Sequence, residues 1–87
     1  LLDATWNRIK KVMAPGALDS VTKELIYIAV SVVNGCEYCV HSHTAVARKK
    51  GMTEEMRSEL LSVIAMASQT NALANAYQIE VDDSFKE

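Results

Sequence analysis

The sequence predicts an all-α protein, a compact bundle of about five helices with a Cys-x-x-Cys motif at the N-terminal end of the third. Apolar residues recur at helical spacing along most of the 87-residue chain, and no stretch alternates between apolar and polar residues as a strand does. Glycine and proline lie between the periodic stretches. The length suits one small domain, so residues 1–87 are expected to form a single helical domain.

The composition argues against several classes of protein. Hydrophobic residues make up 49% of the chain, which is too many for a disordered segment. The net charge of -2 gives no reason to expect nucleic acid or an anionic membrane as a partner, and no apolar run is long enough to span a bilayer. No secretory signal is visible, so a cytoplasmic location is expected. Because the chain begins with Leu1 rather than methionine, we expect that an N-terminal piece is missing.

The first helix is expected over residues 3–13, where apolar residues share one helical face. Its Trp6 and Met13 are expected to pack in the core, as large apolar side chains usually do. The sequence Ala-Pro-Gly at residues 14–16 should then end the helix, because proline and glycine interrupt helical backbone.

The second helix should begin after Asp19 or Ser20, since either side chain can cap it. It is expected to end at Asn34, where Gly35 can supply the left-handed cap residue. Residues 25–33 are apolar nearly all round, a pattern typical of a helix at the centre of a core.

One line of side chains along this second helix is polar. It consists of Glu24, Tyr27, Ser31 and Asn34. These residues recur at helical spacing beside an otherwise apolar surface, so we interpret the line as the side that faces the cysteines. In the alternative interpretation, Glu24 simply lies at the edge of the apolar segment and reaches water.

The third helix is expected over residues 36–50 and should end at Gly51. Thr53 is then positioned to cap a fourth helix. The polar segment 68–71 is expected to be a kink, a break or an exposed turn of one long helix, and residues 72–79 resume the apolar pattern as a fifth helix.

Both cysteines and both histidines lie in one stretch of eight residues, 36–43, in the expected third helix. At 100° per residue, Cys36, Cys39 and His43 fall within an arc of about 60°, whereas Tyr38 and His41 point elsewhere. The spacing therefore predicts a cluster of two thiols and one imidazole. His41 is expected to be a surface or interface residue.

The short connection at Gly35 makes the second and third helices antiparallel neighbours. Glu24 then lies about 15 Å from the turn and His43 about 10 Å, which are comparable depths. His43 is also one helical turn from Cys39. We therefore expect a proton path in the order Glu24, His43, Cys39 and Cys36.

This arrangement suits thiol redox chemistry. His43 can take the proton of Cys39, and Glu24 can fix and stabilise the imidazole. A thiolate reacts with a peroxide to give a sulfenic acid, which the second cysteine converts into a disulfide. A thiol or protein reductant must then reopen that disulfide. No metal, flavin or haem cofactor is required.

Zinc bound by Cys36, Cys39, His43 and Glu24 is the alternative, although the spacing of a zinc finger is absent. Inert buried thiols are a further alternative.

Glu24, twelve residues before the Cys36-x-x-Cys39-x-x-x-His43 motif in an all-helical chain, resembles the alkylhydroperoxidase AhpD-like group of the carboxymuconolactone decarboxylase superfamily. The resemblance covers at least residues 13–61. It extends to the segments Pro15-Gly16-Ala17-Leu18-Asp19, Lys23-Glu24-Leu25, Asn34-Gly35-Cys36-Glu37-Tyr38-Cys39, His43-Thr44 and Gly51-Met52-Thr53.

The resemblance implies a thiol peroxidase that reduces hydroperoxides, assembles as trimers or hexamers and uses Glu24, Cys36, Cys39 and His43. Its best-known peroxidases carry a histidine directly before the second cysteine, where this chain has Tyr38, a poor base at neutral pH. Lactone decarboxylases of the superfamily lack the cysteine pair, which argues against that activity here. Auxiliary roles are expected for Tyr38 and for two residues of the polar line, Tyr27 and Ser31.

Two classes of function therefore remain. One is an enzyme, a peroxidase or a related thiol-disulfide oxidoreductase. The other is a non-enzymatic oligomeric module with a redox-sensing or structural cysteine pair. A homo-oligomer is expected in either case, because the first, fourth and fifth helices carry more apolar residues than a small monomer needs, among them Trp6, Met56, Met66 and Tyr77.

Overall fold

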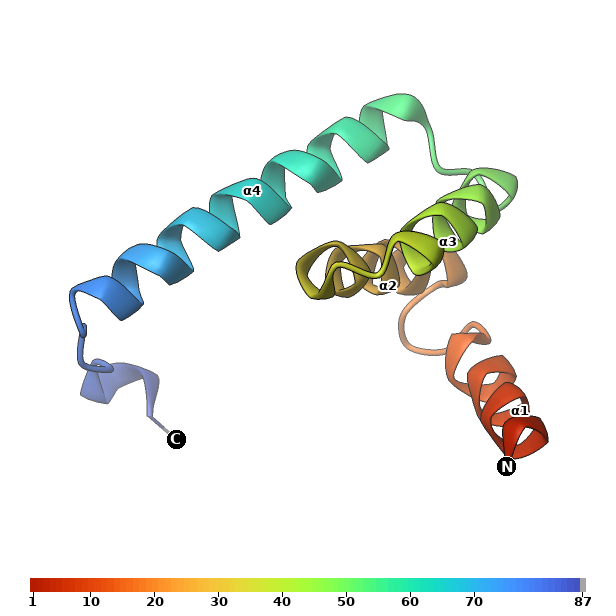
Figure 1. The fold of residues 1–87 in the computed structure, drawn as a ribbon, viewed down its shortest axis with the longest axis horizontal. Coiled ribbons are helices and arrows are strands. Elements are labelled where there is room, and N and C mark those ends of the chain that lie inside the picture. The colour runs from red at the N-terminus through yellow and green to blue at the C-terminus, as the bar shows by residue number, and fades with distance from the viewer. Residues whose placement is uncertain (87) are drawn as a thin grey trace.

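The computed structural model describes residues 1–86, which form four α-helices and one short 3-10 turn without any strand (Figure 1). The all-helical prediction is therefore confirmed. The helices are α1 (Leu2–Met13), α2 (Ser20–Asn34), α3 (Glu37–Lys49) and α4 (Glu54–Ala76), and the 3-10 turn η1 covers Asp83–Phe85. Within this part of the chain, no helix is both long enough and apolar enough to cross a membrane.

The expected fifth helix is wrong, because α4 continues through the polar segment as a single helix of 23 residues. Residues 68–71 contain neither glycine nor proline, and their side chains are exposed. Thr70 donates its hydroxyl to the Ala67 carbonyl at 3.1 Å, a bond made within the helix. Exposed Ser, Gln, Thr and Asn side chains lower helix propensity only slightly, so they do not end a helix of this length. The helix ends at Ala76, two residues before Gln78 takes a positive φ of 52°.

Side-chain caps determine where α2 and α4 begin. Asp19 is the cap of α2, and its carboxylate accepts the Thr22 N–H at 2.7 Å. Thr53 caps α4 by accepting the Met56 N–H at 3.1 Å. Both caps confirm the sequence prediction, and of the two candidates for α2 the structure selects Asp19 over Ser20.

Two glycines end the central helices in the same way. Gly35 has a φ of 71°, and the following Cys36 N–H donates to the Ser31 carbonyl at 2.9 Å. Gly51 has a φ of 110°, and the following Met52 N–H donates to the Ala47 carbonyl at 2.9 Å. A residue with a Cβ rarely adopts such φ values, which is why glycine stands at both places.

The α2 and α3 helices form an antiparallel pair at the centre of the molecule, and α1 and α4 each pack against α2 (Figure 1). The buried apolar core is small and consists of Ile28, Ala47 and Met52. It is extended by the half-buried side chains of Leu25, Val32, Met56 and Leu60. The core therefore holds α2, α3 and the first turns of α4 together and leaves most of α4 free.

The chain is less compact than expected. Its radius of gyration is 15.8 Å, whereas a globular chain of this length has about 12 Å. Helix α2 was expected to be surrounded by core, but Ile26, Val30 and Val33 are exposed because the other helices cover only part of its circumference. Trp6 was expected in the core and is 55% exposed, since α1 contacts only α2.

Candidate functional site

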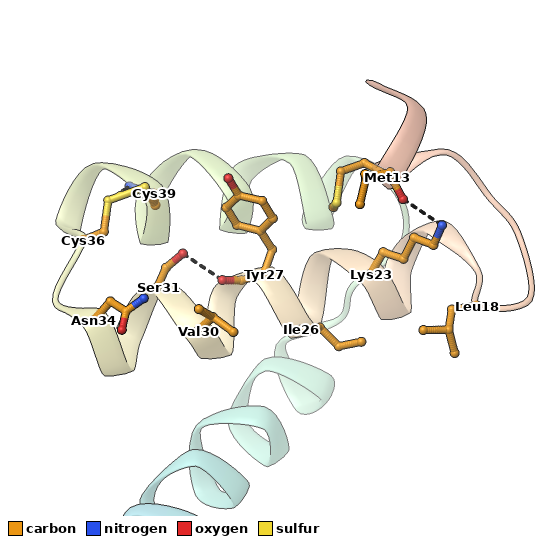
Figure 2. A pocket seen from close by; sticks show the side chains of 11 residues that line it. Met13, Leu18, Lys23, Ile26, Tyr27, Val30, Ser31, Asn34, Cys36 and Cys39 are labelled. Atoms are coloured by element: carbon orange, nitrogen blue, oxygen red, sulfur yellow. Dashed lines mark hydrogen bonds between the residues drawn. A yellow bond between two sulfur atoms is a disulfide. The ribbon is translucent and has the colours of Figure 1, made fainter. Parts of the chain in front are cut away.

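The two cysteines meet at the N-terminus of α3. Cys36 is the cap residue of that helix and Cys39 lies in its first turn, with their Cα atoms 5.3 Å apart. A disulfide joins the two sulfur atoms (Figure 2). The Cys39 N–H also donates to Cys36 Sγ at 3.3 Å. The helix N-terminus therefore points a backbone donor at Cys36.

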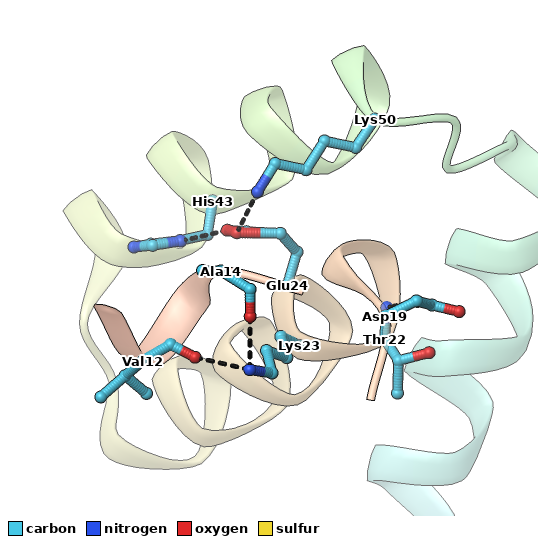
Figure 3. Close-up of polar contacts among 8 residues, drawn as sticks. All are labelled: Val12, Ala14, Asp19, Thr22, Lys23, Glu24, His43 and Lys50. Carbon is cyan, nitrogen blue, oxygen red and sulfur yellow. Dashed lines mark hydrogen bonds and ion pairs between the residues drawn. The ribbon is translucent and has the colours of Figure 1, made fainter. Parts of the chain in front are cut away.

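The predicted meeting of α2 with α3 brings Glu24 against His43. The Glu24 Oε1 atom lies 2.7 Å from His43 Nδ1, and the Glu24 side chain is only 2% exposed (Figure 3). The interpretation in which Glu24 reaches water is therefore wrong. Because a carboxylate can only accept, Nδ1 of His43 carries the proton in this bond. In a neutral ring this leaves Nε2, at the opposite end of the imidazole, as a proton acceptor.

Tyr27 fixes the plane of the same imidazole. Its ring stacks on that of His43 with the centroids 3.6 Å apart and the planes inclined by 20°. Ser31, one turn further along α2, is buried and donates its hydroxyl to the Tyr27 carbonyl at 2.7 Å. The polar line of α2 thus holds His43 in two ways, because Glu24 accepts a hydrogen bond from its ring and Tyr27 stacks against it.

An open cavity of about 530 Å³ lies beside the disulfide (Figure 2). Its polar wall comprises Lys23, Tyr27, Ser31, Asn34 and both cysteines. Its apolar wall comprises Val12, Met13, Leu18, Ile26 and Val30. Three of the four residues of the polar line therefore face the same space as the cysteines, and α1 with the loop after it closes one side.

Two residues near the motif stay outside this arrangement. Tyr38 is 83% exposed, and His41 lies on the surface 4.0 Å from Glu37, which is exposed as well. Neither side chain lines the cavity. In the part of the chain that the structure describes, no three His, Cys, Asp or Glu side chains are grouped as metal ligands, so the four residues proposed for zinc do not converge as a set there.

Lys50 also belongs to this site and was not expected there from the sequence. Its Nζ lies 3.7 Å from Glu24 Oε2, the carboxylate oxygen that does not contact His43 (Figure 3). A signal was present in the spacing, because His43, Ala47 and Lys50 recur at i, i+4 and i+7 and so share one face of α3. This spacing did not identify Lys50 as a site residue, because a lysine at the C-terminus of a helix is ordinarily explained by its interaction with the helix dipole.

The carboxymuconolactone decarboxylase family matches residues 1–80. The crystal structure of the alkylhydroperoxidase AhpD core from Rhodospirillum rubrum superimposes with a TM-score of 0.93 at 55% sequence identity, covering 97% of this chain and 62% of that one.

Two curated relatives extend the comparison. Alkyl hydroperoxide reductase AhpD from Solibacter usitatus is 40% identical over 72 residues, which are 83% of this chain and 39% of that protein. The uncharacterized protein 4 in the cox locus of Paracoccus denitrificans is 42% identical over 74 residues, 85% of this chain and 67% of that protein. This chain thus spans well under half of the Solibacter protein. It belongs to the carboxymuconolactone decarboxylase family and, within it, to the alkylhydroperoxidase AhpD-like group.

Proposed function

We propose that this chain is a thiol-dependent peroxidase that reduces hydroperoxides by cycling Cys36 and Cys39 between dithiol and disulfide. The observation that carries the proposal is the hydrogen bond that His43, one helical turn beyond Cys39 of the disulfide, donates to the buried Glu24 carboxylate. A structural disulfide has no need of an oriented imidazole beside it. Relatives named alkyl hydroperoxide reductase support the same activity.

In the first step Cys39 attacks the peroxide. His43 takes the thiol proton at Nε2, while Glu24 keeps Nδ1 protonated and balances the charge that forms on the ring. The thiolate sulfur bonds to one peroxide oxygen and the O–O bond breaks. His43 returns the proton to the departing oxygen, so the products are a sulfenic acid on Cys39 and an alcohol.

In the second step the Cys36 thiol attacks the sulfenic sulfur, which forms the disulfide and releases water. Two external thiols, or one dithiol, then reduce the disulfide by exchange and are themselves oxidised to a disulfide. The Cys39 N–H that points at Cys36 Sγ suits this half of the cycle, because it stabilises Cys36 as the leaving thiolate when a reductant attacks Cys39.

The cavity supports an organic hydroperoxide as the substrate. A volume of about 530 Å³ is within the range of ligand pockets, and one wall is formed by aliphatic side chains beside the cysteines. The carbon part of the substrate would lie against that wall, with the peroxide group toward Cys39. Assembly of the chain into trimers or hexamers, as the family resemblance implies, belongs to the same proposal.

The experiment that tests the mechanism uses two single serine variants treated with an organic peroxide, followed by mass spectrometry of the trapped sulfenic acid. We expect Cys36→Ser to accumulate it on Cys39 and Cys39→Ser to form little. Glu24→Gln should slow the reaction, and His43→Gln should slow it more, within the about 10²–10⁴-fold range of general acid–base catalysis. The opposite labelling of the cysteines would assign the attack to Cys36, which the helix N-terminus favours.

Two other results would lead away from a peroxidase. Sulfenic acid in neither variant would leave a redox sensor or a structural disulfide as the function, and the exposed Tyr38 in place of a histidine makes this the second candidate. One zinc per reduced chain by elemental analysis, lost in His43→Gln, would favour the metal site. We expect no stoichiometric zinc.

A further inference from the structure

We infer that Lys50 is a positioning residue of this site, which pairs with the buried Glu24 carboxylate and holds it directed at His43. The inference deepens the proposed function and rests on it only for the role of His43. It begins with the two oxygens of Glu24, which have different partners. Oε1 lies 2.7 Å from His43 Nδ1, and Oε2 lies 3.7 Å from Lys50 Nζ.

The burial of Glu24 makes a second partner necessary. The side chain is 2% exposed, and an ionised carboxylate removed from water is strongly unfavourable unless a charge compensates it. His43 supplies a positive charge only while it is protonated. Before the imidazole has taken the thiol proton it is neutral, and at that stage Lys50 is the compensating charge. The lysine therefore gives the Glu24 carboxylate an ion-pair partner in both states of His43.

No other cation near Glu24 in the described part of the chain can compensate its charge as Lys50 does. Among residues 1–86, only His43 and Lys50 lie within ion-pair distance of Glu24; His43 belongs to α3, and Lys50 is the residue that caps its C-terminus. Lys23 is the neighbour of Glu24 along α2, but it points to the other side (Figure 3). There its Nζ donates to the carbonyls of Val12 and Ala14 at 2.8 and 2.6 Å, which fastens α1 to α2.

The position of Lys50 also distinguishes it from the other cations at the end of α3. Arg48 pairs with Glu54 at 3.1 Å, and Lys49 is exposed and forms no ion pair with any described residue. The Lys50 side chain instead turns back along the helix toward α2 and is 34% exposed. This brings Nζ to 3.7 Å from Glu24 Oε2, a distance at which the ion pair acts through charge and needs no particular hydrogen-bond geometry.

The test compares Lys50→Met with Lys50→Arg and with the matched control Lys49→Met, all in the full chain. The first measurement is the rate of iodoacetamide alkylation of the reduced protein, which requires no peroxide. We expect Lys50→Met to slow alkylation about tenfold, a smaller loss than the about 10²–10⁴-fold range for a general acid–base group itself. Lys50→Arg should retain most of the wild-type rate, because it restores the charge, and Lys49→Met should match the wild type.

The second measurement is steady-state peroxide turnover, with thermal unfolding of each variant alongside. We expect Lys50→Met to lower kcat while KM for the reductant stays unchanged. Equal alkylation and turnover in Lys50→Met and Lys49→Met would overturn the inference and leave the peroxidase proposal intact. A loss that Lys50→Arg does not rescue would also overturn it. A wild-type protein without turnover, but with alkylation that depends on Lys50, would reject the peroxidase and keep the inference.

Discussion

Ala47 determines how closely α3 can approach α2, and the Glu24–His43 bond depends on that approach. It is fully buried at 0% exposure and lies between His43 and Lys50 on the face of α3 that meets α2. A methyl group is the smallest side chain that still favours a helix. The site therefore requires a small residue here for a reason separate from its chemistry.

The first prediction concerns this position. Ala47→Val adds two methyl groups to a closed contact, and overpacking of this kind costs about 1–3 kcal/mol of unfolding free energy. By forcing the helices apart, it should also slow alkylation of the reduced cysteines. Chemical unfolding and the alkylation rate measure the two effects. Ala45→Val is the control, because Ala45 is an exposed residue of the same helix. Equal behaviour of the two variants would show that the helices have room to spare.

At the scale of the elements, the cap of α2 predicts a dependence on pH. The hydrogen bond from the Thr22 backbone N–H, with a further one from the Thr22 side chain, holds the pKa of Asp19 below its ordinary value of 3.8. A lowered folded-state pKa stabilises the fold at pH values above the unfolded pKa, and this stabilisation disappears as the pH falls through the folded pKa. The cap should therefore weaken below about pH 4.

Thermal unfolding between pH 7 and pH 3 tests this in two variants. Asp19→Asn keeps a side-chain oxygen acceptor without the charge, so its melting temperature should fall less on acidification than that of the wild type. Asp19→Ala loses the acceptor and should melt at a lower temperature even at pH 7. Parallel pH profiles for wild type and Asp19→Asn would disprove the role of the ionised carboxylate.

The elements also show which features a sequence can predict. The caps at Asp19 and Thr53 and the glycine at Gly35 were predictable, because each depends on hydrogen bonds or φ values within a few residues. The meeting of Glu24 with His43 followed from one short turn and the helical rise. The contact of Lys50 did not, because the end of a long side chain depends on tertiary packing.

The other differences between the sequence prediction and the structure lie at surfaces that the single chain leaves exposed. Trp6 was assigned to the core on its hydrophobicity, yet it is exposed in the single chain. Of the three alternatives for residues 68–71, the structure shows the exposed turn of one long helix, because α4 projects from the molecule there and has no neighbour that requires an apolar face. Periodicity located the helical segments, although it divided α4 in two, and it carries no information on what covers an apolar face that the chain itself leaves exposed.

The accessible surface of the chain is larger than that of a typical folded monomer of the same mass. It measures 7129 Å², whereas a folded monomer of 9.6 kDa exposes about 5,100 Å². Part of the excess forms an apolar stripe along the projecting helix α4. The stripe consists of Val63, Met66 and Leu73 of α4 and of Tyr77, which caps the helix; the four lie on one face and are all exposed. A groove between α2 and α4 runs beside it, lined by residues that include Val33 and Ile64.

We therefore predict that the chain assembles with copies of itself through the α4 stripe. Light scattering coupled to size exclusion should give a mass of three or six times 9.6 kDa. Met66→Glu should shift the protein toward monomer and lower its melting temperature, because it places a charge in the apolar stripe. Ala72→Glu adds the same charge to α4 away from the stripe and should leave the mass unchanged. A wild-type monomer at micromolar concentration would refute the prediction, and would mean that α2 and α3 alone hold Glu24 against His43.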